Sequence, residues 1–197
     1  MLEDSYQVSR CQWCRGDELY ERYHDQEWGV PVNDVTGLFE RLALESMQAG
    51  LAWITVLRKR EHMRARFFDF DPHRLAECGD SELTEWLNDA GLIRHRGKLQ
   101  ALVQNARLVT EEADFVNLIW RHAPANRPAT AIGQVVPSDT HESRAMAKEL
   151  RRKGYRFVGP TICYAFMQSV GMVNDHALDC WRHSACDEMQ RKRRSRQ

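Results

Sequence analysis

The chain has 197 residues, of which 43% are hydrophobic and 9% aromatic, and its 28 basic side chains are balanced by 28 acidic ones. This length is enough for one domain with a sizeable core, and the composition excludes a disordered body. The apolar runs are far shorter than the roughly 20 residues that cross a bilayer. Because the first thirty residues also lack the apolar segment of a secretion signal, we expect a cytoplasmic protein with no membrane partner.

The neutral total conceals a strong local asymmetry of charge. Residues 1–50 carry ten acidic and four basic side chains, whereas residues 191–196 carry five basic ones. Further basic groups lie at residues 58–66 and 148–156. A polyanion such as DNA would therefore meet local basic patches, although such patches are also typical of ordinary solvated helix faces.

Helical periodicity runs through nearly the whole chain. Asp34 can cap a helix whose apolar stripe includes Leu38 and Leu42, and a second stretch continues past Gly50 until Asp71-Pro72 ends it. Further apolar stripes predict helices near residues 80–90, 99–109 and 114–120, and prolines and glycine predict a long loop over residues 123–139. No segment alternates as strands do, so we predict an all-α fold.

The segment from about residue 140 to residue 172 predicts a helix-hairpin-helix. A basic helix begins at Ser138 or Thr140 and ends at Lys153-Gly154, and an apolar helix follows Val158-Gly159-Pro160. Such a hairpin offers backbone N–H groups and a helix N-terminus to a DNA phosphate, with Lys153 and Arg156 beside it. The pattern alone also fits an ordinary helical hairpin in a bundle.

Glu45 occupies an unusual position for a carboxylate. It lies three residues after Leu42 and four before Ala49, on the apolar face of its helix. Burial there costs several kcal/mol unless the carboxylate has a partner or a purpose. The alternative is a helix rotated so that Glu45 reaches solvent or pairs with an arginine.

Three aromatic residues are candidate stacking surfaces: Tyr23, Trp28 and Trp53. Aromatic side chains more often belong to a core than to a binding site. Together with a buried carboxylate, however, they describe a pocket for a flat ring, including a cationic one.

The six cysteines indicate a metal rather than disulfides, because four of them lie near the chain ends together with histidines. The candidate ligands are Cys11, Cys14, His24, His176, Cys180, His183 and Cys186. His176 and Cys180 are four residues apart, so a helix would present both to one ion, and Cys11 and His24 could complete a tetrahedral site. Spacing leaves the Cys11–Cys14 and His183–Cys186 pairs open as alternatives.

Several sequence blocks, taken together, resemble one protein family. They are Arg10-Cys11, Tyr23-His24-Asp25, Glu27-Trp28-Gly29-Val30-Pro31, Leu44-Glu45, Gln48-Ala49-Gly50-Leu51, Phe157-Val158-Gly159-Pro160-Thr161 and Val173-Asn174-Asp175-His176. From about residue 10 to residue 181 the chain resembles the bacterial constitutive 3-methyladenine DNA glycosylases of the helix-hairpin-helix superfamily. The extra Cys14, His183 and Cys186 and the basic tail depart from the family pattern.

The resemblance implies an enzyme of DNA base-excision repair. Such an enzyme flips N3-methyladenine out of alkylated duplex DNA and hydrolyses its N-glycosidic bond, releasing the free base. The resemblance also implies a structural zinc ion that joins the chain ends through Cys11, His24, His176 and Cys180. It places Glu45, Tyr23 and Trp53 in the base pocket.

A methylated adenine is already cationic, so its departure needs little protonation, and stacking and electrostatic positioning can supply most of the catalysis. An anionic Glu45 suits that cation. Asp175 is a second catalytic candidate, either orienting water or supporting the neighbouring His176. No lysine falls in a matched catalytic position, so we expect a monofunctional enzyme that leaves an abasic site.

We expect residues 1–187 to form a single domain, residues 188–197 to form a disordered basic tail, and the protein to act as a monomer. Two other classes of protein share parts of the pattern. A non-enzymatic DNA-binding protein would keep the hairpin but would have no reason to bury Glu45. A zinc-stapled interaction module would need neither the hairpin nor the aromatic pocket.

Overall fold

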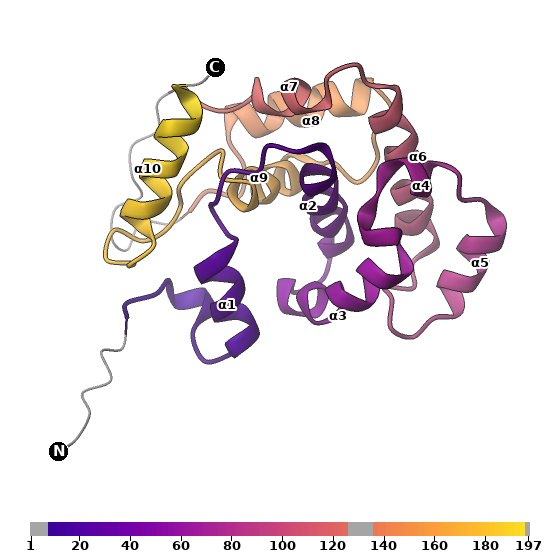
Figure 1. Cartoon of the computed structure of the whole chain (residues 1–197), viewed down its shortest axis with the longest axis horizontal. Coiled ribbons are helices and arrows are strands. Elements are labelled where there is room, and N and C mark those ends of the chain that lie inside the picture. Colours follow the sequence, from indigo (N-terminus) through magenta and orange to yellow (C-terminus); the bar gives the residue numbers. More distant parts are fainter. Residues whose placement is uncertain (1–7, 126–135, 196–197) are drawn as a thin grey trace.

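The protein is built from helices, as the periodicity predicts. The computed structural model describes residues 8–125 and 136–195, and it has no strand within these ranges. The elements in chain order are η1 (Gln12–Cys14), α1 (Glu18–Gln26), α2 (Val35–Gln48), α3 (Trp53–Arg66), η2 (Phe68–Phe70), α4 (Pro72–Ala76), α5 (Asp80–Asn88), α6 (Arg96–Glu111), α7 (Phe115–Trp120), α8 (His141–Arg152), α9 (Pro160–Ser169) and α10 (His183–Arg194) (Figure 1). Residues 126–135 of the expected long loop lie outside the described ranges. None of the described helices is long and apolar enough to cross a membrane.

The helix starts follow local capping chemistry. Asp34 accepts a hydrogen bond from the Gly37 backbone N–H at 2.7 Å, and Thr140 accepts one from Ser143 at 3.3 Å. These bonds satisfy backbone donors that the first helical turn leaves unpaired. Helix α5 begins at Asp80 after Gly79, whose N–H is bound by the Glu82 carboxylate.

Helix α2 is the centre of the molecule. Residues 41–47 are all buried, because the helix packs against α3, α6 and α9 on different sides. Phe39, Leu42 and Leu44 are fully enclosed in the main core. A helix buried nearly all round can bring a polar residue to the interior only at a cost, and α2 brings Glu45 there.

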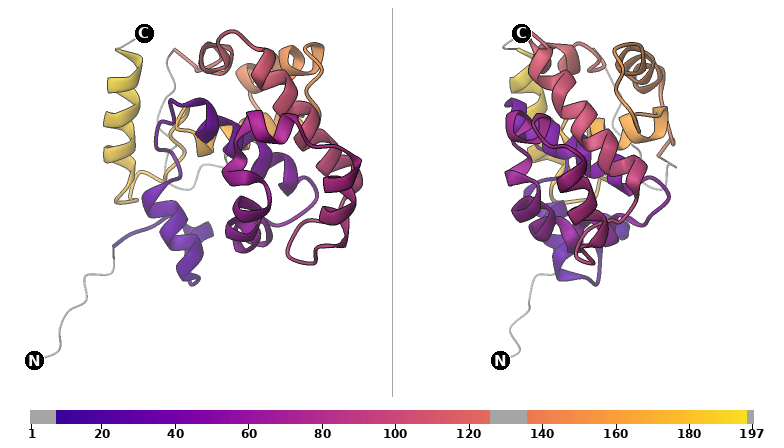
Figure 2. Two further views of the ribbon diagram at one scale, coloured as in Figure 1. Left: turned by 45° about the vertical axis from the view of Figure 1, so that its right-hand side comes forward. Right: turned by 90° about the vertical axis from the view of Figure 1, so that its right-hand side faces the viewer.

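A short hairpin joins α8 to α9, and the two helices pack together (Figure 2, right). Gly154 has a φ of +100°, a conformation that glycine adopts without strain. Asn105 of α6 fixes the hairpin, since its side chain accepts from the Arg156 N–H at 2.9 Å and donates to the Arg156 carbonyl at 3.0 Å. The predicted helix, turn and second helix are therefore present.

The prediction of a disordered tail from residue 188 is wrong for residues 188–194, which belong to α10. Cys186 and Gln190 are buried one turn apart, and the Gln190 amide donates to the Gly29 and Val173 carbonyls at 3.0 and 3.1 Å. The many charged residues of this helix hid that narrow buried stripe from sequence analysis. Helix α10 lies at the opposite end of the molecule from α5 (Figures 1 and 2).

Gly29 offers a test of this packing. Its φ is +80°, and an added Cβ would lie 2.8 Å from Cε1 of His176. We expect Gly29→Ala to lower the free energy of unfolding by about 2–4 kcal/mol, because backbone strain and steric overlap add. Gly16 is a matched control with a φ of +86°, and within the described residues no atom beyond its two chain neighbours lies within 4 Å of its added Cβ.

For Gly16→Ala we expect only the strain, about 1–2 kcal/mol. Denaturant unfolding of both variants measures the difference. Equal losses would show that the His176 side chain does not press against Gly29.

Candidate functional site

A pocket of about 260 Å³ opens between η1, α1, α2 and α9. Aromatic rings form much of its wall, and two carboxylates and two amides supply polar groups. The lining residues are Trp13, Tyr20, Tyr23, Trp28, Glu45, Gln48, Trp53, Val136, Ala165, Gln168 and Asp175. The structure thus brings Glu45, Asp175 and all three predicted stacking residues into one cavity.

The Glu45 side chain is buried, with only 4% of the residue exposed. Its Oε2 has no hydrogen-bond partner within the described residues, so the alternative of a solvated or arginine-paired Glu45 does not hold there. Burial raises the pKa of this carboxyl to about 8, and the positive charge of Arg41 opposes the rise. An acceptor of this kind gains most from a cationic or hydrogen-donating ligand.

The aromatic wall contains rings at several angles. The Tyr23 and Trp53 rings lie 5.3 Å apart between centroids, and the Trp53 indole N–H is buried without a partner in the described ranges. Trp13 is 40% exposed and meets Trp28 edge to face at 5.1 Å. This mixture of stacked surfaces and polar tips suits a flat heteroaromatic ring.

Sequence reasoning missed Trp13, Tyr20 and Gln168. Trp13 lies between Cys11 and Cys14, so the position of the cysteine cluster was the signal that could have placed it. Tyr20 is three residues before Tyr23, on the same face of α1. Gln168 had no local signal, because its role depends on where α9 meets the segment after it.

Asp175 faces the pocket from the segment between α9 and α10. It is 6% exposed, and its Oδ2 accepts hydrogen bonds from the Tyr164 hydroxyl at 2.5 Å and the Gln168 amide at 2.7 Å. These donors hold the carboxylate in a fixed orientation. Asp175 is also joined through the backbone to His176, so the pocket and the histidine are positioned together.

Three of the four predicted zinc ligands converge near the pocket. The ligand atoms of Cys11, His24 and Cys180 all lie within 4.8 Å of one another, and all three residues are buried. The Cys180 sulfur is 3.4 Å from Nε2 of His24. Hydrogen bonding from Cys11 lowers the pKa of Cys180, which favours the thiolate that binds metals.

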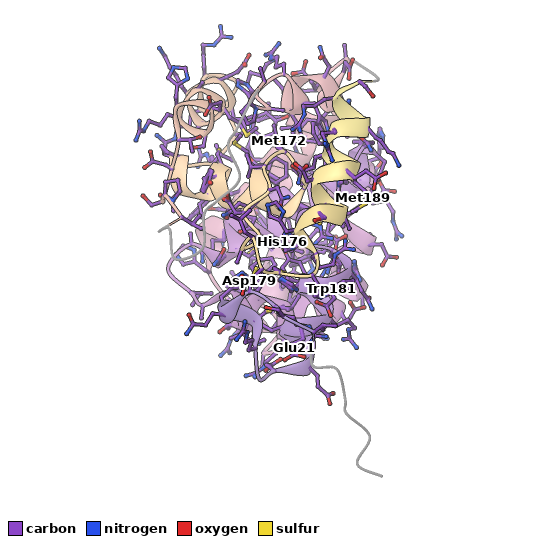
Figure 3. The ribbon with its side chains drawn as sticks, turned by 90° about the vertical axis from the view of Figure 1, so that its left-hand side faces the viewer. Glu21, Met172, His176, Asp179, Trp181 and Met189 are labelled. Atoms are coloured by element: carbon purple, nitrogen blue, oxygen red, sulfur yellow. The ribbon has the colours of Figure 1, made fainter. Side chains whose placement is uncertain are left out.

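His176 adjoins this group, although its ligand atoms are not within the 4.8 Å set. Its ring lies 4.9 Å from that of His24, and its Nε2 is buried with no partner in the described part of the chain. Figure 3 shows His176 on the segment before α10, with Asp179 and Trp181 further along that segment towards α1.

The rival ligands lie outside the cluster of three. The Cys14 thiol donates to the Cys11 carbonyl at 3.1 Å, and the Cys186 thiol lies 3.9 Å from the Trp28 carbonyl. The His183 backbone carbonyl accepts a hydrogen bond from the Asn174 side-chain amide at 2.9 Å, and the His183 ring is in no group of three ligands among the described residues.

Trp28 connects the pocket to the cysteine and histidine cluster. Its ring is stacked near His24 at 6.1 Å and lies edge to face with His176 at 4.5 Å. The same ring lines the pocket. Any group that fixes the two histidines therefore also fixes one wall of the pocket.

The predicted DNA-contact residues fall into two classes. Gly159 caps α9 and Pro160 is its first residue, so the hairpin backbone is available, whereas the Val158 side chain is buried in the core. The Arg156 side chain is exposed, but the Lys153 ammonium forms an ion pair with Glu112 at 2.6 Å.

Arg151 is a hairpin cation that sequence analysis missed. Its Nη2 reaches the Gly159 turn, where an added Cβ would lie 3.2 Å away. Although Arg151 belongs to α8, its guanidinium therefore lies beside the N-terminus of α9.

Comparison with known proteins gives a consistent result. A model of the methyladenine glycosylase family matches residues 13–183. The chain is 46% identical over 180 residues to DNA-3-methyladenine glycosylase 1 of Escherichia coli (strain K12), covering 88% of this chain and 96% of that protein. It is 44% identical to the DNA-3-methyladenine glycosylase of Haemophilus influenzae, covering 88% of this chain and 97% of the relative.

Solved structures agree with the sequence comparison. A crystal structure of 3-methyladenine DNA glycosylase I matches with a TM-score of 0.85 and 45% identity, covering 89% of this chain and all (100%) of the other. A structure of the Staphylococcus aureus enzyme, which concerns its recognition of 3-methyladenine, matches with a TM-score of 0.81 and 27% identity, covering 89% and 97% of the two chains. The chain belongs to the methyladenine glycosylase family.

Proposed function

We propose that this protein is a DNA base-excision repair glycosylase that flips N3-methyladenine out of alkylated duplex DNA and hydrolyses its N-glycosidic bond. The observation that carries the proposal is the buried Glu45 carboxyl at an aromatic pocket. A cationic base satisfies both features, because it supplies a charge for the carboxylate and a flat face for the rings. The solved relatives that bind 3-methyladenine support this choice by family likeness.

The chemistry follows from the charge of the substrate. N3-methyladenine leaves as a neutral base from a cationic nucleoside, so departure needs little help from a general acid. The protein contributes by extruding the nucleotide, stacking the base against Tyr23, Trp28 and Trp53, and accepting hydrogen bonds at Glu45. These contacts bind and orient the cationic nucleotide, and because positive charge moves to the sugar as the bond breaks, an interaction that strengthens on the sugar side lowers the barrier.

Asp175 is the second carboxylate at the pocket, and we assign it to the sugar side of the reaction. Held by Tyr164 and Gln168, it can orient the attacking water or stabilise the developing positive charge on the sugar. No lysine lines the described pocket, which supports hydrolysis to an abasic site rather than a covalent imine route.

A zinc ion fits the residues at the chain ends. Nδ1 of His24 contacts Asp25 at 2.8 Å and Nδ1 of His176 contacts Asn174 at 3.0 Å, which leaves both Nε2 atoms for a metal. With the Cys11 and Cys180 sulfurs, these atoms make a two-cysteine, two-histidine set typical of structural zinc. The bound ion would supply no chemistry to the substrate and would fasten the N-terminal segment to the segment after α9.

The helix-hairpin-helix formed by α8 and α9 would bind the DNA backbone. The N–H groups at Gly159 and the start of α9 can bind a phosphate without reading sequence, with Arg151 and Arg156 adding charge.

We propose that the protein acts as a monomer in the bacterial cytoplasm.

The Glu45→Gln variant tests the base pocket. Glutamine keeps the shape of Glu45 but cannot ionise. The barrier to release of N3-methyladenine from duplex DNA should therefore rise by about 1–3 kcal/mol, which slows release roughly 5- to 150-fold. In the wild type, the second-order rate constant should rise as pH approaches about 8, because the raised pKa leaves Glu45 protonated at lower pH. In the variant, this rise should vanish.

Asp175→Asn is the companion variant, measured in the same single-turnover assay. A wild-type rate and pH profile for Glu45→Gln, together with an inactive Asp175→Asn, would assign the chemistry to Asp175 alone. A protein that binds the DNA but releases no base would be a DNA-binding protein rather than a glycosylase.

The metal assignment predicts different effects for two buried cysteines. Cys180→Ser should lower bound zinc below half an equivalent and reduce thermal stability, because the chain ends lose their fastening. Cys14→Ser should retain close to one equivalent, since the Cys14 thiol donates to the Cys11 backbone carbonyl and is not in the group of three ligand atoms. Metal analysis of the purified proteins measures both, and a metal lost equally in the two variants would support the Cys11–Cys14 alternative.

The hairpin predicts which cations contact phosphate. Binding to undamaged duplex DNA should weaken steeply with salt, and each lost phosphate contact should reduce the log–log slope by about 0.9. Arg151→Ala and Arg156→Ala should each reduce it. Lys153→Ala should change it less, because Glu112 already compensates that charge. An unchanged slope in the arginine double variant would remove both side chains from the interface.

A further inference from the structure

A network of ion pairs built on two buried arginines lies apart from the residues that line the pocket. Arg60 is 4% exposed and binds both Glu27, at 2.7 Å, and Glu40, at 2.9 Å. Arg64 shares Glu40 at 2.8 Å. Charges this deep need partners, and the contacts tie the end of α1 to α2 and α3.

Arg41 joins this group from α2. It is 7% exposed, and its Nη2 lies 2.5 Å from the Glu27 carboxylate. Its guanidinium carbon lies 5.5 Å from the centroid of the Tyr23 ring, whose other contacts include Trp53 of the pocket. Its Nη1 is buried and has no hydrogen-bond partner within the described residues.

Glu45 follows Arg41 by four residues, which places the two side chains one turn apart on the same helix. Both are more than nine-tenths buried. The other titratable groups that line the pocket with Glu45 are Tyr20 and Tyr23 on α1 and Asp175 after α9. Among these neighbours Arg41 alone is cationic, and its field is poorly screened because water is excluded.

The ion pair of Arg41 leaves part of its charge uncompensated. Its partner Glu27 is shared with Arg60, and the Glu27 side chain is 30% exposed and partly screened by solvent. The remaining positive charge of Arg41 favours an ionised Glu45.

We propose that Arg41 supplies the buried positive charge against which Glu45 ionises, and that it thereby sets the lowest pH at which the pocket takes up a cationic base. This inference rests on the proposed role of Glu45 in base recognition. Arg41 is a positioning residue that acts through Glu45 and Tyr23 and does not touch the base. Loss of its charge shifts the working range of the pocket to higher pH.

The decisive experiment measures Glu45 directly in the full-length protein. Glutamate labelled with ¹³C at the side-chain carboxyl is titrated by NMR, and the Glu45 signal is identified by its loss in Glu45→Gln. We expect Arg41→Met to move the Glu45 midpoint upward by about one pH unit or more. Arg41→Lys, which restores the charge, should keep it within a few tenths of a unit.

Arg60→Met is the matched control, because Arg60 is equally buried and also binds Glu27. It should lower thermal stability without moving the Glu45 midpoint. Arg41→Gln retains a donor for Glu27 without the charge, so it gives the same test if the methionine variant does not fold. An unmoved midpoint in a folded Arg41→Met or Arg41→Gln protein, or equal shifts in the Arg60 control, would overturn the inference.

The pH profile of base release separates this inference from the proposed function. If the Glu45 midpoint and the release profile move together, both stand. If the midpoint moves while release of N3-methyladenine keeps its wild-type profile, Arg41 still controls the ionisation of Glu45, and the proposed role of Glu45 in base recognition is wrong.

Discussion

The burial of one carboxyl group, Glu45, is the constraint on which the site depends. Removing a carboxylate from water is costly, and the cost is tolerated only where another charge or a ligand offsets it. Helix α2 carries Glu45 into the centre of the molecule, α1 and α3 enclose it with aromatic rings, and Arg41 lies one turn away. The empty pocket therefore carries the desolvation cost of the Glu45 carboxylate, and a cationic aromatic ligand would offset that cost.

The chain ends hold the other side of that pocket. Helix α1 belongs to a small apolar cluster of its own, so its position depends on the segments that fasten it. Trp28 packs against both His24 and His176, and Asp175 immediately precedes His176. A structural metal at this junction would thus influence the pocket without lining it, because it would fix the position of Trp28 and Asp175, which do line it.

Helix α9 links the hairpin, which we propose as the DNA-contacting end of the molecule, to the pocket. Its N-terminus lies at the hairpin, and Gln168 near its C-terminus holds Asp175. A phosphate bound at one end and an extruded nucleotide bound at the other would therefore be held at a fixed distance by one rigid helix. The hydroxyl of Tyr164, on the same helix, also donates a hydrogen bond to Asp175 and so helps to hold that carboxylate in place.

The sequence by itself determined the helices and the hairpin, because periodicity and capping are local properties of the chain. It placed Glu45 on an apolar helix face but left open whether the carboxyl is buried, which the packing of α2 decided. Family resemblance also brought forward four candidate ligands, of which the structure groups Cys11, His24 and Cys180 and places His176 beside His24. Tertiary structure alone decided that Glu112 compensates Lys153, that Arg41 lies behind Tyr23, and that residues 188–194 pack as a helix. Each of these depends on contacts between segments that are distant in the sequence. Whether a charge is compensated, or an apolar stripe buried, is decided by the residues that the fold packs against it.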